Sequence, residues 1–250
     1  MQRESVNQKR GVSARNRVMW LAVLIAAPAT LLVAWRFGNR KYYLSSMLLI
    51  VYAMFPFFVR FEHKKPQARE LVTIAVMSAV AVASRAAFIM VPFFKPLTGI
   101  VMITGMALGP EAGFLTGAVS GFVSNFIFGQ GPWTPWQMYA WGLIGFLSGI
   151  AGQRKWFRRR GVLYFAGFLA GILFDWFLNL QYLIGYIRPV SWQAIVLTYT
   201  AGLGFDLVHG SSTVLFLMLL EKPWGKKLHR LKMKYGILSA QEEKGEESCI

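Results

Sequence analysis

Long apolar runs are the feature that most limits what this chain can fold into. Eight such runs alternate with short polar stretches, at 18–35, 42–59, 71–91, 97–109, 112–128, 135–152, 162–185 and 193–220. A helix needs about 20 mostly apolar residues to cross a hydrocarbon core about 30 Å thick, and most of these runs approach that length. They lack the period-two alternation of outer-membrane barrel strands. The sequence therefore predicts an all-α, polytopic membrane protein.

The two shortest runs leave the number of membrane crossings open. Residues 97–109 and 112–128 could be two tilted helices or one re-entrant hairpin that turns at Gly109, Pro110 and Glu111. Both arrangements return the chain to the same side of the membrane, so the expected orientation of the later runs does not depend on the choice.

The basic residues divide unevenly between the two expected sides of the membrane. Twenty-one of the 27 Lys and Arg lie on one side, in the N-terminal tail, 60–70, 153–161 and the C-terminal tail. The opposite side carries only Arg36, Arg40, Lys41, Lys95 and Arg188. Because cytoplasmic loops are enriched in Lys and Arg, both ends are expected in the cytoplasm of a plasma-membrane protein. Membrane orientation also explains the net charge of +16, so no nucleic-acid partner is expected.

Composition divides the chain into three parts. Residues 1–66 are expected to form a cytoplasmic tail and two extra transmembrane helices, because a charged stretch follows the second run. Residues 67–222 are expected to form a core of six helices. Residues 223–250 are a charged cytoplasmic tail, and its low apolar content around 241–247 favours disorder.

Small residues repeat every four positions along the run at 71–91. Ala75, Ala79, Ala83 and Ala87 share one helix face, where another helix backbone can approach closely in lipid. The simpler interpretation is internal packing within the bundle. The alternative is docking onto a separate membrane subunit.

The stretch between the runs at 112–128 and 135–152 has an unusual composition. It reads Phe-Gly-Gln-Gly-Pro-Trp-Thr-Pro-Trp-Gln over residues 128–137. Its glycines permit tight turns, its prolines fix φ, and Pro135 suits the first turn of a helix with Thr134 as the N-cap. The stretch could be an interfacial loop anchored by tryptophan. Because that leaves Gln130 and Gln137 unexplained, a rigid outer loop that offers rings and amides to a ligand is favoured.

Polar side chains interrupt the later runs. They are Arg85, Asn125, Asp175, Asn179, Gln181, Asp206 and His209. A charge at mid-membrane costs at least ~2.5 kcal/mol on insertion scales, so such residues usually face a cavity or a partner. Asp175 and Asn179 lie one turn apart, and Tyr182 continues their face. That face could contact a ligand or form internal hydrogen bonds, and Arg85 could pair with Asp175 or Asp206.

Several chemistries have no support in the sequence. It contains no Walker A motif, no His-Glu-x-x-His motif and no Cys/His cluster with zinc spacing. The single cysteine, Cys249, supports no disulfide framework. ATP hydrolysis by this chain and a resident metal or cofactor are therefore not expected.

The loop at 130–138 and the face formed by Ala75, Ala79 and Ala83 resemble those of the substrate-binding (S) components of energy-coupling factor (ECF) vitamin transporters. The resemblance covers about 67–222. It implies six helices and a ligand pocket near the outer surface. It also implies that the alanine face docks on a transmembrane scaffold subunit, which is coupled to two ATPase subunits. The loop is most similar to the cobalamin branch, so cobalamin or a related vitamin is the expected ligand.

The leading hypothesis is therefore a vitamin-binding subunit of an ECF importer, with a ligand entrance between 92–97, 129–136 and 186–192. The residues expected to pack on the ligand are Trp133, Trp136 and Tyr182. Those expected to hydrogen-bond it are Gln130, Gln137, Asp175 and Asn179.

Two other hypotheses remain open. A stand-alone secondary transporter or channel could use Arg85, Asp175, Asp206 and His209 as a proton relay. A lipid-modifying membrane enzyme could use Asp206 and His209 as an acid–base pair.

Overall fold

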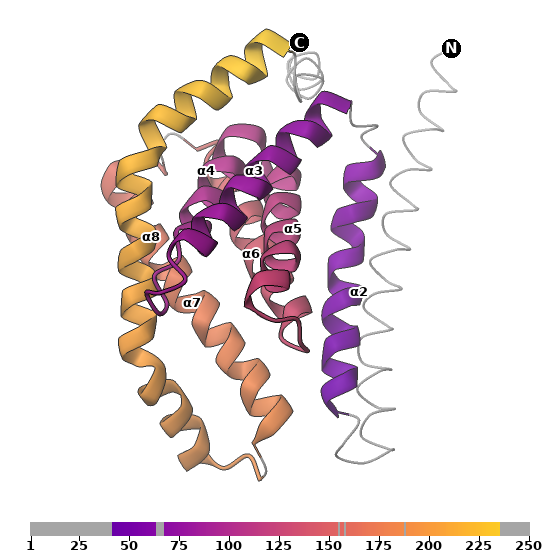
Figure 1. Cartoon of the computed structure of the whole chain (residues 1–250), viewed down its shortest axis with the longest axis vertical. Coiled ribbons are helices and arrows are strands. Elements are labelled where there is room, and N and C mark those ends of the chain that lie inside the picture. The colour runs from indigo at the N-terminus through magenta and orange to yellow at the C-terminus, as the bar shows by residue number, and fades with distance from the viewer. Residues whose placement is uncertain (1–41, 64–67, 155, 158, 188, 236–250) are drawn as a thin grey trace.

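The computed structural model describes residues 42–63, 68–154, 156–157, 159–187 and 189–235. Seven helices and no strands occupy these ranges (Figure 1). They are α2 Tyr42–His63, α3 Ala68–Ala87, α4 Pro96–Leu108, α5 Pro110–Phe128, α6 Thr134–Ala151, α7 Arg160–Tyr186 and α8 Trp192–Tyr235. The predicted all-α fold is confirmed. The run at 18–35 and the stretch at 241–247 lie outside the described residues.

Helix length separates membrane-spanning candidates from shorter helices. Within the described ranges, 68–87, 160–186 and the 192–228 part of α8 are long and apolar enough to cross a membrane. Helix α4 has 13 residues. At 1.5 Å per residue it is about 20 Å long, which is less than the hydrocarbon core. The stretch at 97–128 forms two separate helices, and the first of them is shorter than the thickness of the hydrocarbon core.

Proline and glycine set the helix starts. Proline occupies the first turn of α4, α5 and α6, where its missing N–H leaves no hydrogen bond unmade. Gly109 joins α4 to α5 with φ of 101°, a left-handed conformation that favours glycine. The expected N-cap role of Thr134 is wrong, because α6 begins at Thr134 and no side chain caps it. The Thr134 hydroxyl instead donates to the Gln130 side chain at 2.9 Å.

Helix α4 lies at the centre of the bundle. It packs against α3, α5, α6, α7 and α8, and most of its side chains are buried, including Leu97, Ile100 and Val101. A central helix surrounded on all sides explains its continuous apolar sequence, which lacks a polar face.

Helices α5 and α6 approach each other at glycine. A Cβ atom on Gly113 would collide with the backbone at Gly145, and one on Gly117 would collide with the backbone at Trp141. Small residues at such positions let helix backbones pack closely in lipid. This contact fixes α6 against α5, and therefore fixes the loop between them.

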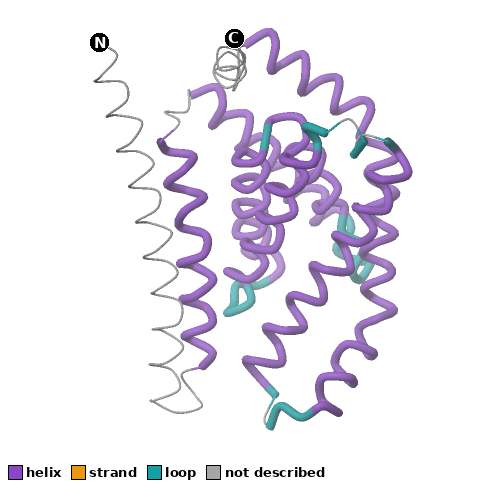
Figure 2. Tube along the Cα trace, turned by 180° about the vertical axis from the view of Figure 1, so that it is seen from behind, coloured by secondary structure: helices purple, strands orange, loops and turns teal. Residues whose placement is uncertain are grey.

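Helix α2 lies outside the central group, alongside α5 and α6 (Figures 1 and 2). The ring of Phe57 stacks on Phe114 of α5 at 4.0 Å between centroids and meets the edge of Phe146 of α6 at 5.0 Å. Phe114 is fully buried, so α2 covers an apolar face of the core.

The connections fall at two ends of the bundle. The end of α2, the start of α3, the junction between α4 and α5, the start of α7 and the end of α8 lie at the upper end of Figure 1. The loop at 88–95, the loop at 129–133 and the α7–α8 connection face the other way, at different depths. The charge distribution groups the connections in the same way, and the side of the membrane that each end faces stays a prediction. The last predicted run, 193–220, is the first part of a longer helix that passes through Pro223 to Tyr235.

Candidate ligand-binding cavity

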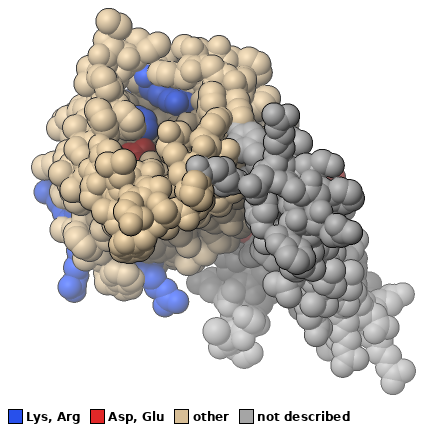
Figure 3. All heavy atoms as spheres, turned by 90° about the horizontal axis from the view of Figure 1, so that it is seen from below, with Lys and Arg blue, Asp and Glu red and all other residues tan. Residues whose placement is uncertain are grey.

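A cavity of about 500 Å³ opens between the loop at 88–95 and helices α7 and α8. Its polar and charged lining residues are Arg85, Lys95, Gln137, Asp175, Asn179 and Asp206. Its aromatic lining residues are Phe88, Phe93, Phe94, Phe128 and Phe205. Seen from below, basic and acidic side chains lie together in a recess of a mostly uncharged surface (Figure 3). Mostly apolar walls with a few placed polar groups are typical of small-molecule sites.

A second cavity of about 370 Å³ lies between α4, α6 and α7. Its lining is aliphatic and aromatic apart from Ser148, and it contains no charged or amide side chain. It offers too few polar groups to orient a polar ligand. The cavity under the loop at 88–95 is therefore the candidate site.

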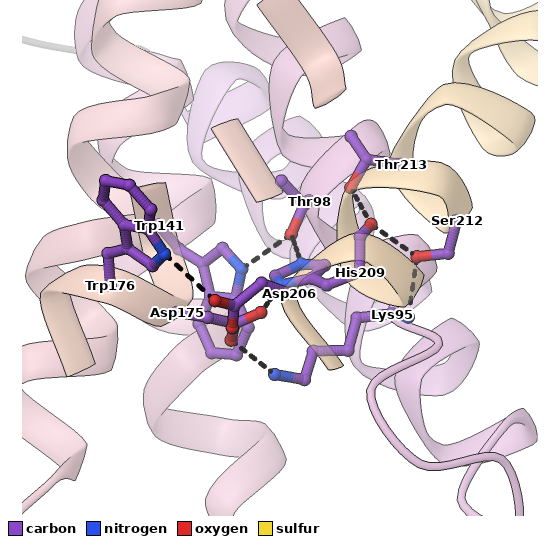
Figure 4. Close-up of polar contacts among 9 residues, drawn as sticks. All are labelled: Lys95, Thr98, Trp141, Asp175, Trp176, Asp206, His209, Ser212 and Thr213. Atoms are coloured by element: carbon purple, nitrogen blue, oxygen red, sulfur yellow. Dashed lines mark hydrogen bonds and ion pairs between the residues drawn. The ribbon is translucent and has the colours of Figure 1, made fainter. Parts of the chain in front are cut away.

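Lys95 joins that loop to the helices beneath it (Figure 4). Its ammonium lies 3.2 Å from Oδ1 of Asp175 on α7, and its backbone N–H donates to the Ser212 hydroxyl of α8 at 3.1 Å. Burial lowers the pKa of the Lys95 ammonium, and the Asp175 carboxylate opposes that shift. The ion pair and the backbone bond together hold the end of the loop over the cavity.

Phe93 adopts an unusual backbone conformation in the same loop. Its φ of 60° lies in the left-handed region, which non-glycine residues rarely occupy. Its ring stacks on Phe205 of α8 at 4.5 Å and lies 4.7 Å from the Lys95 ammonium. Such backbone strain persists where surrounding contacts impose it, and it concentrates at functional sites.

A buried hydrogen-bond chain continues from Asp175 into the core (Figure 4). Nδ1 of His209 lies 2.7 Å from Oδ2 of Asp175, and Nε2 lies 2.8 Å from the Thr98 hydroxyl. The Trp141 indole donates to the same hydroxyl at 3.0 Å. Because an ionised carboxylate can only accept, Nδ1 carries the proton shared with Asp175, and Nε2 of the neutral ring then accepts from the Thr98 hydroxyl. The chain fixes the tautomer of His209 and the orientation of the Asp175 carboxylate.

Two polar groups on the cavity wall remain available to a ligand. Asp206 accepts a hydrogen bond from the Trp176 indole through Oδ2 at 3.0 Å, which leaves Oδ1 without such a bond among the described residues. The side-chain nitrogen of Asn179 is buried and has no hydrogen-bond partner within the described part of the chain. An unpaired buried donor is costly, so a ligand acceptor at this point would be favourable.

The Arg85 side chain contacts α5 and not the acidic residues with which the sequence analysis pairs it. Its guanidinium donates to the side chains of Ser124 and Asn125 on α5, the latter at 3.1 Å. It also lies 4.2 Å from the ring of Phe128. The expected pairing with Asp175 or Asp206 is therefore wrong. Asp175 instead forms an ion pair with Lys95.

The structure brings together three of the seven expected ligand contacts. Gln137, Asp175 and Asn179 line the cavity. The other four are not among its lining residues, and each has a local contact. Gln130 donates to the Phe122 carbonyl, the Trp133 indole donates to the Gly129 carbonyl, Trp136 packs on Phe177, and Tyr182 stacks on Tyr186.

The sequence predicts a ligand entrance at 92–97, but it assigns no role to Lys95 or to the phenylalanines before it. One signal was present, because Lys95 is among the five basic residues on the side with little positive charge. It also follows two phenylalanines directly, which is an unusual place for an isolated lysine unless a carboxylate lies nearby.

The alanine face of α3 points away from the bundle. Ala75, Ala79 and Ala83 are exposed, whereas Ile74, Met77 and Ala81 on the other face are buried. Internal packing among the described helices therefore does not account for the alanine repeat.

The apolar helices and the cavity are typical of a membrane protein that binds a small molecule. A protein-family model described as the S component of an ECF-type riboflavin transporter matches residues 65–204. The match covers more than half of the chain, and the chain belongs to this family of S components. No solved structure matches the chain.

Family membership settles the general role. The chain is a multi-pass membrane protein and a substrate-binding subunit of an ECF vitamin transporter, whose family partners are a scaffold and ATPase subunits. The family is one of transporter components and not of enzymes. The expected cobalamin branch is not confirmed, because the matched description names riboflavin.

Proposed function

We propose that this chain captures riboflavin in the cavity under the loop at 88–95 and presents it to an ECF transporter. The observation that carries the proposal is the buried side-chain nitrogen of Asn179, which has no hydrogen-bond partner among the described residues and lies on the wall of an aromatic-lined cavity. The family match supports the choice of vitamin, because it names riboflavin and spans almost the whole cavity lining.

The chemistry of riboflavin suits these walls. Its flat ring system can pack on phenylalanine rings such as Phe93 and Phe205. The amide of Asn179 would donate to a ring carbonyl, and the Asp206 carboxylate would accept from a hydroxyl or ring N–H. A cavity of about 500 Å³ falls within the range of about 300–1,000 Å³ that is usual for such ligands. Cobalamin is several times larger than riboflavin, so the volume favours the smaller vitamin.

Among the residues expected from the sequence, we assign direct contact to Gln137, Asp175 and Asn179. For Gln130, Trp133, Trp136 and Tyr182 we propose an indirect role, because each is held by neighbours outside the cavity lining. They would support the outer walls and not touch the ligand.

Titration of the purified protein with riboflavin, followed by quenching of flavin fluorescence, tests the proposal. Asn179→Ala should weaken affinity by about tenfold, since one hydrogen bond to a buried amide is worth about 1–1.5 kcal/mol. Gln193→Ala removes an exposed amide outside the cavity lining; it is the matched control and should bind as the unaltered chain does. A chain that binds cobalamin but no riboflavin would overturn the choice of ligand.

Partner docking is assigned to the exposed alanine face of α3. Ala75, Ala79 and Ala83 would receive a helix of the scaffold subunit, because small side chains permit close backbone approach in lipid. With the basic ends in the cytoplasm, the stretches at 60–70 and 153–161 would lie on the side where the ATPase subunits act. Residues 1–66 would be an extension to the six-helix core.

A self-contained proton relay is less well supported. The chain of hydrogen bonds through Asp175 and His209 ends at the Trp141 indole, which can donate but not accept a proton. Arg85 donates to α5 and lies outside this chain. The arrangement suits a rigid binding site and not a path across the bundle.

A further inference from the structure

The last part of α8 has a strongly two-sided sequence. In residues 222–235, the apolar side chains Trp224, Leu228, Leu231 and Tyr235 follow the spacing i, i+4, i+7 and i+11, which places them on one helix face. The remaining positions include six Lys or Arg and no acidic residue. We call residues 222–235 the basic arm.

The structure fixes the beginning of this arm to the bundle. Leu228 is 4 % exposed and belongs to the same apolar cluster as Phe157 and Leu163, and Trp224 packs against that cluster. Further along the same face, Leu231 is exposed. The basic side chains Lys222, Lys226, Lys227 and Arg230 are exposed as well. The apolar face of the arm is therefore buried against the bundle at Leu228 and exposed at Leu231.

The position of the arm places it at a membrane surface. Helix α8 has 44 residues and is about 66 Å long at 1.5 Å per residue, far more than a hydrocarbon core of about 30 Å. Its last part leans over the upper end of the bundle, beside the stretch at 152–159 (Figure 1). That stretch presents the exposed basic residues Arg154 and Arg159, with Arg160 at the start of α7. The arm therefore lies at an end of the bundle where basic residues gather, which is typical of the side that faces an anionic lipid surface.

We propose that the basic arm lies along the membrane surface and binds the phosphate groups of anionic phospholipids. Its exposed Leu231 faces the acyl boundary, and its Lys and Arg reach the headgroups on either side. Helices with one apolar face and a Lys/Arg-rich polar face bind membranes in this way, and their binding depends on anionic lipid. The inference is independent of the ligand in the cavity.

Two labelling positions test the geometry without changing the charge of the arm. In the full-length Cys249→Ser protein, Leu231→Cys or Met233→Cys is labelled with a fluorophore in nanodiscs. The discs contain phosphatidylcholine, alone or with phosphatidylglycerol. Position 231 lies on the apolar face and 233 lies on the opposite face. With anionic lipid, acrylamide should quench the label at 231 several-fold less, whereas the label at 233 should stay accessible. Equal quenching of the 231 label in both lipids would overturn the proposal.

Charge neutralisation tests the cause. In the Leu231→Cys protein, the triple change Lys226→Gln, Lys227→Gln and Arg230→Gln should abolish the difference between the two lipids, as should high salt. The matched control neutralises Arg154, Arg159 and Arg160 and should keep the difference. If the control loses it too, overall charge and not the arm is responsible. If the 231 label is protected only when scaffold and ATPase subunits are added, the arm binds protein, and the proposal fails.

Discussion

Asp175 is the residue on which most of the candidate site depends. Its two carboxylate oxygens hold different partners, the Lys95 ammonium at 3.2 Å and the His209 ring at 2.7 Å. Asp175 is 5 % exposed, and a buried charge is tolerated where a cation and hydrogen bonds compensate it. One side chain of α7 thereby positions the loop at 88–95 and a ring of α8 at the same time.

Thr98 is the residue that connects this site to the central helix. Thr98→Val removes the hydroxyl that accepts from Trp141 and donates to His209, so two buried groups lose their partner. We expect a loss of stability of about 2 kcal/mol, measured by thermal unfolding in detergent. Thr104→Val is the matched control, because Thr104 is equally buried on α4 and bonds only to the Ile100 carbonyl of its own helix. Equal losses in the two variants would show that the buried chain adds no stability.

The sequence predicts the positions of the helices far better than it predicts the residues of the candidate site. Apolar runs and proline give the starts of α4 and α5 to within a few residues, because both signals act locally. The contacts of Asp175 join residues 80 and 34 positions apart, to Lys95 and His209 respectively. No spacing along one helix encodes such pairs. Trp133 illustrates a false positive of the sequence. Its indole donates to the nearby Gly129 carbonyl, and the sequence does not distinguish such a tryptophan from one that contacts a ligand.

The close contact between α5 and α6 gives a second prediction. Gly145→Ala places a methyl group against the backbone at Gly113, well under 3.0 Å from it, so the helices must separate. We expect a marked fall in the yield of folded protein, measured by size-exclusion chromatography. Gly204→Ala on α8 is the control, because no atom lies within 4 Å of its added Cβ. That change should be neutral or slightly stabilising, since alanine favours helix. A Gly145→Ala protein as well folded as the control would refute the close approach.

Helix α3 offers the third prediction, on partner binding. Ala79→Leu fills the exposed small-residue face without touching the core or the cavity. Co-purification with the scaffold subunit should fall by tenfold or so, because a loss of close packing worth about 1.4 kcal/mol has that effect. Riboflavin affinity should not change. Val196→Leu enlarges an exposed valine on a different helix, α8, and should leave co-purification intact. A similar loss in both variants would remove the alanine face as the docking surface.

At the scale of the whole molecule, the candidate cavity and helix α2 occupy separate places. Every residue that lines the candidate cavity comes from 85–206, within α3 to α8 and their connections. Helix α2 instead covers the outer faces of α5 and α6, through Phe57 on Phe114 and Phe146. The basic arm lies at one end of the bundle, whereas the loop at 88–95 faces the other way. The candidate cavity and the basic arm therefore occupy different parts of the bundle.

This separation predicts the effect of removing residues 1–66. The shortened chain should bind riboflavin with unchanged affinity, because no residue of α2 lines the cavity. It should unfold at a lower temperature, because the fully buried ring of Phe114 loses its cover. Phe57→Ala in the full chain removes only the stacked ring and should cost about 2 kcal/mol, from lost stacking and lost apolar burial, which is a part of the same loss. Fluorescence titration and thermal unfolding measure the two effects separately. A shortened chain that is monodisperse but binds no riboflavin would show that the extension shapes the site, contrary to the geometry of α2.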